Sequence, residues 1–483
     1  MKQSKTILLI LIAITQLFSK GEWSDRVLLS GSDWCQNPSI KVDSKGRIHA
    51  IWTESINYKN SYVVYSKSED GGVTWTEPYK VSSNDTMRVW EPKLVIDSYD
   101  NPHIAYLLSR GEGSRVFYKK FNGITWSQDF EVEEFVVARL RMGIDHDDRV
   151  YLTWFTGDNI TGKGYFTYYD NGWKDPIPIS EQHYLTAMSK FIFDSENSLY
   201  LSGFNRNDCR AFLAKYSKSD EEWVSIEKIF DNGELSVGLD IEIYNDKFFS
   251  VVSSGESYGT NETYFSFRSL DGNEWEHSNY ITYHTNEEKR LLINNGIPYI
   301  FEIHYPHLNR KQSSPYKKNT DWSSEIVCSY KNGSDWITES IESEQDRYTL
   351  SLDGALDPTR NKLYILYNLG PVANYSDIYF RSREVLVGID EEELSIDTYS
   401  LSNYPNPFNS TTTIGFKLPK ISDISLQIFN NSGELVKTLI NNQRVKSGNH
   451  EVVLDLENYS SGVYYSKLTV NNKVVTAKHV YIR

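Results

Sequence analysis

The sequence has 483 residues, of which 39% are hydrophobic and 24% are charged, with 34 Tyr, 21 Phe and 12 Trp. This length is too great for one ordinary core, and the composition excludes a disordered chain, a collagen, a multi-span membrane protein and a disulfide scaffold. Residues 21–384, called the body below, carry 38 basic and 55 acidic side chains, a net charge of −17. An acidic body argues against general nucleic-acid binding, which requires a basic surface to neutralise phosphate.

The first residues have the pattern of a secretory signal peptide. Lys2 and Lys5 precede an apolar run over residues 7–14. A basic start followed by a short apolar run predicts an export signal, here residues 1–19 with cleavage near Ser19. The run is too short for a transmembrane span of about 20 apolar residues, and no later segment is apolar enough to cross a bilayer. The alternative interpretation is a buried helix.

The cysteines do not form a disulfide or metal pattern. Cys35, Cys209 and Cys328 lie far apart in the sequence. An exported chain that relied on disulfides would carry an even and denser set, so we expect these three to be small core residues. No cluster of Cys and His has metal-ligand spacing, and no motif for a cofactor is present, so we expect neither a metal nor a cofactor.

The body is a repeat array. Each unit begins with a strand, an Asp-rich turn and a second strand, at residues 37–52, 91–106, 142–154 and 190–201, with weaker copies at 241–251, 291–301 and 352–366. A second pair of strands follows and ends near a tryptophan: Trp75, Trp126, Trp173, Trp223, Trp275 and Trp336, spaced 51, 47, 50, 52 and 61 residues apart. Four strands in a unit of about 50 residues predict the blade of a β-propeller.

The two ends of the body predict how the ring closes. Seven units have the first pair of strands, but only six have a tryptophan strand after it. Residues 23–30, which start at Trp23, resemble residues 75–82 and supply the missing outer strand. We therefore predict a seven-bladed propeller over residues 23–384, closed by residues 23–30. Such closure pairs an edge strand without a disulfide.

One turn carries a family motif. Ser68, Asp70, Gly72, Thr74 and Trp75 fit the Asp-box, Ser-x-Asp-x-Gly-x-Thr-Trp. The body therefore resembles the sialidase-like propellers with bacterial neuraminidase repeats, and the resemblance implies the fold more than an activity. If the strands of a blade are lettered a to d from the axis outward, the a–b and c–d turns share one end of the propeller, the turn end. The Asp-box lies there, opposite the usual site.

The d–a and b–c loops share the other end, the loop end, and the d–a loops converge near the axis. Arginines recur there beside aromatic and acidic residues, and the candidates for substrate binding are Arg88, Trp90, Glu91, Arg139, Arg141, Arg290, Arg347 and Tyr348, with His304 from a b–c loop. Arginine binds a sugar carboxylate through two parallel hydrogen bonds, and aromatic rings stack on sugars. This hypothesis of an anionic-sugar site requires the five arginines to converge in one pocket. The alternative is that they pair with neighbouring acids such as Glu91 or Asp240.

The sequence leaves catalysis open. A sialidase would show an Arg-Ile-Pro strand near the start, and the nearest match, residues 46–49, reads Gly-Arg-Ile-His. Some propellers that this one resembles are polysaccharide lyases that use His and Tyr for proton abstraction. Here such a role could fall to His183, His304, His307, Tyr258 or Tyr348. No motif requires an enzyme, and a carboxylate pair for glycoside hydrolysis cannot be recognised from spacing alone.

The end of the chain differs from the body. Residues 385–399 carry five acidic and no basic side chains and form a predicted linker, whereas residues 400–483 carry nine basic and five acidic side chains. The latter begin with Tyr404-Pro405-Asn406-Pro407-Phe408 and continue in alternating strands separated by turn signals, which predict a small immunoglobulin-like β-sandwich.

This segment resembles the C-terminal sorting domain, type A, of the type IX secretion system, although Ser410 stands where the family often has proline. The resemblance implies a Gram-negative bacterium, interaction with the secretion machinery, and release of the body or its attachment to the cell surface. The alternative is an ordinary stabilising module.

Together these patterns predict an all-β, secreted or cell-surface propeller that binds polysaccharide or glycoprotein glycans through its axial rim. The alternatives are a carbohydrate-active enzyme, either a polysaccharide lyase or a sialidase-like glycoside hydrolase, and a non-catalytic propeller that binds proteins or mediates adhesion.

Overall fold

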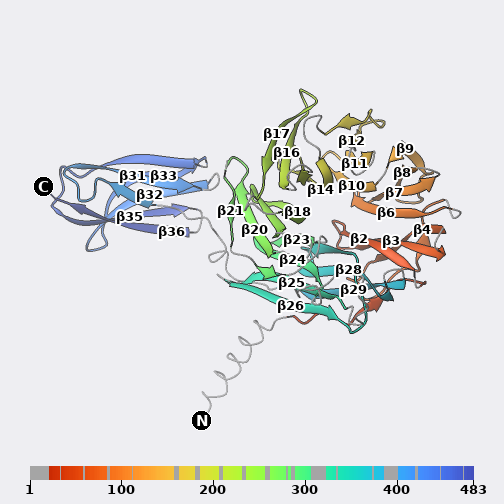
Figure 1. Ribbon diagram of the computed structural model, residues 1–483. Coiled ribbons are helices and arrows are strands. Elements are labelled where there is room, and N and C mark those ends of the chain that lie inside the picture. The colour runs from red at the N-terminus through yellow and green to blue at the C-terminus, as the bar shows by residue number, and fades with distance from the viewer. Residues whose placement is uncertain are drawn as a thin grey trace, which may run out of the picture. The chain divides into compact units, whose positions relative to one another are not determined.

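The structure of the chain is a computed structural model (Figure 1). It describes residues 21–32, 34–57, 60–83, 87–110, 113–136, 138–156, 163–179, 185–205, 210–230, 235–255, 262–272, 274–278, 281–283, 289–305, 323–332, 335–372, 375–385, 401–418, 422–446, 448–470 and 473–482. The predicted signal peptide and nearly all of the predicted linker lie outside these ranges. The chain divides into two compact units, Met1–Ile389 and Asp390–Arg483, which are described separately.

The described part of the first unit consists of antiparallel β-sheets. Strands 1 to 15 are β1 (Val27–Leu28), β2 (Cys35–Val42), β3 (Ile48–Asn57), β4 (Asn60–Ser68), β5 (Tyr79–Lys80), β6 (Val89–Ile96), β7 (Pro102–Arg110), β8 (Gly113–Lys120), β9 (Phe130–Val136), β10 (Ala138–Ile144), β11 (Val150–Thr156), β12 (Lys163–Tyr169), β13 (Ile177–Pro178), β14 (Leu185–Phe193) and β15 (Leu199–Asn205). Strands 16 to 29 are β16 (Ala211–Ser217), β17 (Glu222–Lys228), β18 (Leu235–Tyr244), β19 (Lys247–Gly255), β20 (Glu262–Ser269), β21 (Glu276–His277), β22 (Thr282–Tyr283), β23 (Lys289–Asn294), β24 (Ile297–His304), β25 (Glu325–Asn332), β26 (Asp335–Ser343), β27 (Leu352–Asp357), β28 (Lys362–Val372) and β29 (Tyr375–Glu384).

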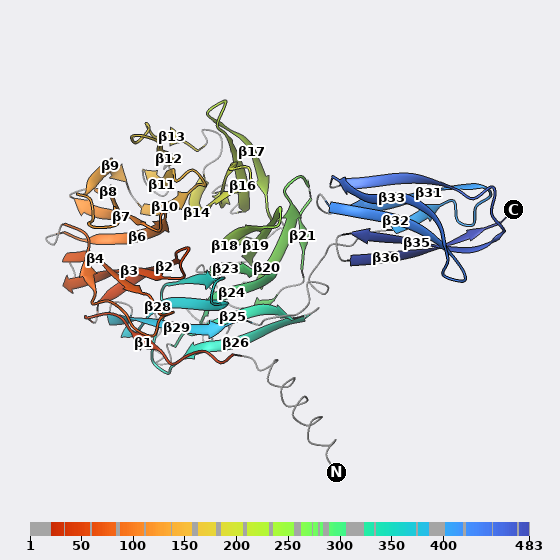
Figure 2. The ribbon, with the colours of Figure 1, turned by 180° about the vertical axis from the view of Figure 1, so that it is seen from behind.

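These strands form seven antiparallel sheets among the described residues. Six follow the order of the chain, with β22 pairing back with β20 in one of them, and the seventh has the order β1-β29-β28-β27. The sheets begin at β2, β6, β10, β14, β18, β23 and β27, and we call them blades 1 to 7 in that order. Each of these first strands contacts the first strand of the next blade, and β27 contacts β2, so the first strands enclose an axis. Figures 1 and 2 view this ring along the axis from its two sides. The all-β propeller class is thereby confirmed.

Blade 7 is completed by the start of the described chain. β1 pairs with β29, with Val27 opposite Phe380 and Leu28 opposite Tyr379. Further backbone bonds extend the contact, since Ser24 N–H donates to Ser382 O and Leu29 N–H donates to Ile378 O. The outer edge of β29 is therefore covered, which leaves fewer unpaired backbone groups exposed.

The apolar cores of the propeller lie between neighbouring blades. The cluster of Trp52 and Val64 with Tyr364 and Phe380, for example, joins blades 1 and 7. A tryptophan reinforces many of these contacts, because its ring meets an aromatic ring of the preceding blade nearly edge-on, at centroid distances of 5.1 to 5.4 Å: Trp75 with Phe380, Trp126 with Tyr65, Trp173 with Tyr118, Trp223 with Phe166 and Trp336 with Phe265. The tryptophan repeat thus serves packing, as edge-to-face aromatic pairs do in other cores.

The two cysteines that the structure describes have the surroundings of core residues. Cys35 and Cys328 are buried free thiols, and Cys209 lies outside the described residues. Burial is the largest cause that raises the pKa of the Cys35 thiol to about 12. A neutral, inert thiol is expected in such an apolar setting.

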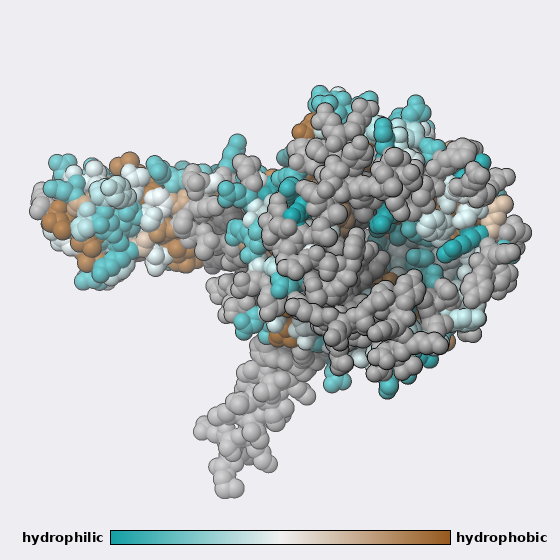
Figure 3. All heavy atoms as spheres, viewed as in Figure 1, coloured by the Kyte–Doolittle hydropathy of each residue, from teal (hydrophilic) through white to brown (hydrophobic). Residues whose placement is uncertain are grey.

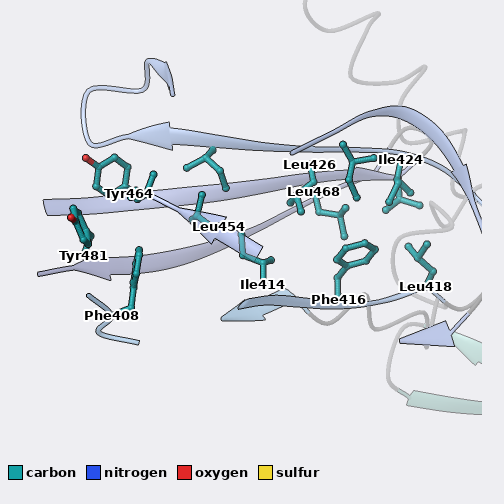
Figure 4. Close-up of a cluster of buried hydrophobic side chains, with 14 residues drawn as sticks. Phe408, Ile414, Phe416, Leu418, Ile424, Leu426, Leu454, Tyr464, Leu468 and Tyr481 are labelled. Atoms are coloured by element: carbon teal, nitrogen blue, oxygen red, sulfur yellow. The ribbon is translucent and has the colours of Figure 1, made fainter. Parts of the chain in front are cut away.

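The second unit is a sandwich of two sheets, with strand orders β30-β31-β34 and β33-β32-β35-β36. Its strands are β30 (Leu401–Tyr404), β31 (Thr411–Leu418), β32 (Ser422–Asn430), β33 (Leu435–Val445), β34 (Gly448–Asp455), β35 (Gly462–Val470) and β36 (Lys473–Tyr481). Figure 4 shows its core, in which Ile414 and Phe416 of one sheet face Leu426 and Leu468 of the other. On the face seen in Figure 3, hydrophilic and apolar side chains both reach the surface of this unit.

The Tyr-Pro-Asn-Pro-Phe motif fastens the first strand of the second unit to the last. Asn406 accepts a hydrogen bond from Val480 N–H at 2.9 Å and donates to Lys478 O at 3.1 Å. The Phe408 ring is buried 5.3 Å from the ring of Tyr481. Ser410 has a φ of 57°, a conformation that proline cannot adopt.

Candidate functional site

The turn end of the propeller is built by repeated aspartates. In blade 2, Asp97 Oδ1 accepts hydrogen bonds from the backbone of Tyr99 and Asn101, while Oδ2 lies 3.2 Å from His103 Nε2. The same arrangement, with His or Tyr as the ring partner, recurs at Asp43, Asp145, Asp194 and Asp357. Burial alone would raise the pKa of Asp97, but its hydrogen bonds from Asn101 and His103 outweigh burial and lower it. These carboxylates are turn caps.

A second repeated bond links the turns of neighbouring blades. Ser44 N–H donates to Asp100 Oδ1 at 2.9 Å, and Ser98 N–H donates to Asp148 Oδ1 at 2.7 Å. His146 N–H donates in the same way to Asn197 Oδ1 at 3.1 Å. These hydrogen bonds hold neighbouring blades together at the turn end. The side chains that accept them are thus occupied by structural contacts.

The Asp-box residues also support the turn end. Ser68 Oγ accepts from Gly72 N–H at 2.8 Å, and Asp70 accepts from Thr74 N–H at 2.9 Å. The pKa of Asp70 is lowered to about 2. The largest cause is the hydrogen bond from the Thr74 side chain, and the bond from the Thr74 backbone N–H also lowers it. Arg360 donates both to Glu69 O in this c–d turn and to Gly46 O in an a–b turn, which places the two kinds of turn at one end.

An axial cavity of about 370 Å³ lies inside the ring and is lined by all seven innermost strands. One level of its wall consists of one side chain from each blade: Ser39, Lys93, Arg141, Lys190, Asp240, Arg290 and Asp353. Each of these residues is paired with the second strand of its blade three or four pairs before the a–b turn, which places the seven at about the same level. The volume falls within the range of small-molecule sites, about 300–1,000 Å³.

The cavity wall carries more positive than negative charge. Five lining residues are cationic, and three are carboxylates: Lys41, Lys93, Arg141, Lys190 and Arg290 against Asp240, Glu242 and Asp353. The difference of five and three is an excess of two positive charges in a body whose net charge is −17. Such a local excess favours an anionic ligand, because field lines concentrate in a low-dielectric recess.

The carboxylates of the wall are held by the backbone and by the cations. Asp353 accepts from Ile40 N–H at 3.0 Å and from Arg290 Nε at 2.6 Å, and Lys41 Nζ lies 3.4 Å away. Burial alone would raise the pKa of Asp353, but Lys41, Arg290 and these bonds together hold it well below its usual range. Asp353 therefore stays ionised and links blade 7 to blade 1.

Asp240 makes the equivalent link from blade 5 to blade 6. It accepts from Leu291 N–H at 2.8 Å, and Lys190 Nζ lies 3.5 Å from its Oδ1. Lys190 also contacts Glu242. Burial opposes the charge of Lys190, but these two carboxylates outweigh burial and raise its pKa. The lysine therefore remains cationic in the wall.

The structure brings together only part of the predicted site. Arg141 and Arg290 line the axial cavity. Arg88 and Arg139 are exposed and do not line it, and Arg347 lies 3.5 Å from Glu344 through its Nε. Two of the five arginines, Arg141 and Arg290, therefore share the axial cavity, and a site that joins all five stays a prediction. Two of the arginines pair with acids, Arg290 with Asp353 and Arg347 with Glu344.

The other predicted site residues serve mainly to hold the fold together. Trp90 packs against the apolar cluster between blades 2 and 3. Glu91 accepts from Leu140 N–H at 2.8 Å and thus links the same two blades. The backbone of Tyr348 pairs with Gly370, and burial is the largest cause that raises the pKa of its phenol. His183, Tyr258 and His307 lie outside the described residues.

His304 belongs to a buried polar cluster between blades 5 and 6. Its Nε2 lies 3.6 Å from Oε2 of Glu302, whose other oxygen accepts from Lys289. Thr263 and Thr282 donate to Glu302 at 2.7 and 2.8 Å. Burial would raise the pKa of Glu302, but Lys289 and His304 outweigh it and lower it. The cluster is an internal ion pair with both carboxylate oxygens engaged.

The sequence marks the cavity wall by its distance from the turn aspartates rather than by the loops. Ser39, Lys93, Arg141, Lys190 and Asp353 each stand four residues before a turn aspartate. Counting back from that aspartate finds the wall directly. Counting from the start of the strand does not, because the register shifts there between Gln36 and Ser39 and at equivalent places in blades 2 and 3.

The described part of the chain holds no group of three or more His, Cys, Asp or Glu side chains arranged for a metal ion. Among the same residues no helix is long and apolar enough to cross a membrane.

The chain is similar to several solved structures. A protein of unknown function from Dyadobacter fermentans is 11% identical with a TM-score of 0.45, and the match covers 76% of this chain and 100% of that one. A polysaccharide lyase is 10% identical with a TM-score of 0.46 over 75% and 91% of the two chains. A Hadza microbial sialidase is 11% identical with a TM-score of 0.42 over 73% and 66%. Comparison with curated proteins finds no match.

The second unit has a family match of its own. Residues 402–483 match the family described as the secretion system C-terminal sorting domain. The predicted sorting tail is thereby confirmed, and with it export to the cell surface or the extracellular space. The protein is an all-β chain that carries a type IX secretion sorting domain at residues 402–483.

Proposed function

We propose that this exported propeller binds anionic glycans, and that the ligand's charged sugar enters the axial cavity. The observation that carries the proposal is the excess of cations, five against three carboxylates, around a cavity in an acidic body. Polar groups that converge in a recess of this size are typical of small-molecule sites. Export to the cell surface or beyond would place the site where polysaccharides and glycoproteins are met.

The carboxylate of a uronate or the sulfate ester of a sulfated sugar would be attracted by this wall. Hydrogen bonds from Arg or Lys to such groups are stronger than those between neutral partners. A neutral sugar would gain none of this energy, so charge is the property by which the site would select its ligand.

Equilibrium binding by the purified protein tests the proposal. Titration calorimetry with oligogalacturonate, a sulfated oligosaccharide and a neutral malto-oligosaccharide should show binding of one or both anionic ligands and none of the neutral one. Raising the salt concentration should weaken the binding, because ions screen the charges. Equal binding of the neutral sugar, or no binding of either anion, would refute the proposal.

A further inference from the structure

The charge of the axial cavity is unevenly distributed around the ring. The neighbouring strands β6, β10 and β14 contribute Lys93, Arg141 and Lys190 to the wall and no carboxylate. The four remaining strands contribute two cations and all three carboxylates. We call the first set the cationic arc. Its formal charge is +3, against −1 for the rest of the wall.

The opposite side of the wall is occupied by its own interactions. Asp240 and Asp353 each accept a backbone N–H from the next blade, at 2.8 and 3.0 Å. Asp353 also takes the Arg290 guanidinium at 2.6 Å. Because these carboxylates link blades and hold cations, their side of the cavity acts as a structural part of the ring.

The cationic arc is linked in a different way. Between blades 2 and 3 the backbone link is made by Glu91, which accepts Leu140 N–H at 2.8 Å. Glu91 stands two residues before Lys93, outside the level of the wall. The wall position therefore need not supply the linking carboxylate in this blade and is occupied by a lysine. Lys93 and Arg141 lie on strands that contact each other, at the same level.

We propose that the cationic arc, with Lys93 and Arg141 at its centre, is the subsite for the anionic group of the ligand. This inference rests on the proposed function and deepens it, since it names the side of the cavity that binds charge. The group is a carboxylate or a sulfate ester, to which arginine donates two hydrogen bonds and lysine supplies a point charge. Lys190, held at the edge of the arc by Asp240 and Glu242, flanks it.

Charge-removing variants of the full-length protein test the subsite. Lys93→Gln and Arg141→Gln should each weaken the binding of trigalacturonate, or of a sulfated trisaccharide, at least about tenfold. Arg88→Gln and Arg139→Gln remove charge from exposed arginines outside the cavity and should leave the affinity within about twofold. Whichever trisaccharide binds, the uronate or the sulfated one, shows whether the anionic group is a carboxylate or a sulfate ester. Inorganic sulfate should compete in either case.

A footprint on the unaltered protein covers the case in which a variant fails to fold. Trigalacturonate, or the sulfated trisaccharide, should slow the reductive methylation of Lys93 and leave that of Lys45 unchanged. The Lys45 side chain is 65% exposed at the turn end. Wild-type affinity in both Lys93→Gln and Arg141→Gln, an equal loss in Arg88→Gln, or an unprotected Lys93 would overturn the inference while leaving the proposed function intact. Failure of the wild-type protein to bind any anion would overturn both.

Discussion

The propeller and the sorting domain are stabilised in different ways. In the propeller each described apolar cluster joins two neighbouring blades, so its core is a series of interfaces around a ring. In the sorting domain one cluster fills the space between two sheets, with Ile414, Leu426 and Leu468 among its fully buried members. A ring of interfaces repeats the same hydrogen bonds from blade to blade, whereas a single core has no equivalent positions. Substitutions in the propeller can therefore be compared with matched sites in other blades.

The largest loss of stability is expected at the ion pair of Lys289 and Glu302, which lies between blades 5 and 6 and is not part of the repeated pattern. Lys289→Met would leave the carboxylate of Glu302 buried without its cation, which should lower the free energy of unfolding by about 3–5 kcal/mol. Denaturant unfolding of the full-length protein measures it. Because the pKa of Glu302 is lowered in the fold, this ion pair stabilises above the unfolded value of about 4.3, and its contribution is lost as the pH falls through the lowered pKa.

The control is a second change that removes the stranded charge. In the double variant Lys289→Met with Glu302→Leu, most of the stability should return, since an apolar pair of similar volume commonly replaces a buried ion pair without loss. If the double variant were no more stable than Lys289→Met, the loss would come from the hydrogen bonds that Thr263 and Thr282 make to Glu302 rather than from its unpaired charge.

Gly72→Ala should cost about 3–4 kcal/mol. Gly72 has a φ of 92°, and an added Cβ would lie 2.1 Å from the Phe380 ring of blade 7, so strain and overpacking add. Gly123 occupies the equivalent turn of blade 2 with a φ of 90°, and an added Cβ there would lie 3.7 Å from Asn101 Oδ1. Gly123→Ala should therefore cost only about 1 kcal/mol, for the backbone alone. Equal losses in thermal unfolding would show that the contact between blades 7 and 1 is not tight.

Acid should weaken the sorting domain through one buried histidine. His479 is buried in β36, both its ring nitrogens lack a hydrogen-bond partner among the described residues, and burial lowers its pKa to about 4. The unfolded chain binds the proton near pH 6.5, so stability is lost as the pH falls from about 6.5 to 4, by about 3 kcal/mol in all. The opening equilibrium of the β35 and β36 amides, obtained from hydrogen exchange after correction for the intrinsic rate at each pH, should rise over that interval. His479→Leu should abolish the rise, and His450→Gln, at a partly exposed position, should not.

The smallest effect is expected at the links between turns. Asp148→Gly removes the acceptor of Ser98 N–H and Oγ–H but still allows the φ of 60°, and should cost about 1–2 kcal/mol. Ser98→Ala keeps the backbone donor and should lose less than half as much. If Ser98→Ala lost more, the hydroxyl rather than the backbone would carry the link.

The repeats could be predicted from the sequence because each blade repeats a similar pattern of residues. Turn aspartates, turn glycines and tryptophans recur at similar spacing, and they mark strands, turns and interfaces together. The site was harder to predict. A bulge at the start of the innermost strands gives Asn37, Glu91 and Arg139 a positive φ, and an extra residue there changes which side chains face the axis. Arg139 is exposed for this reason, while Arg141 faces the cavity.

Because β1 pairs with β29, the first and last strands of the body lie side by side. The arrangement of the blades therefore does not depend on which blade the chain enters first. Gly21 lies against Glu384, so a short peptide could join the two ends of the body. New termini could then open in the exposed turn at Asn122 and Gly123. Such a circular permutant would retain the pairings of all seven sheets, because chain ends that lie together at a surface tolerate this rearrangement.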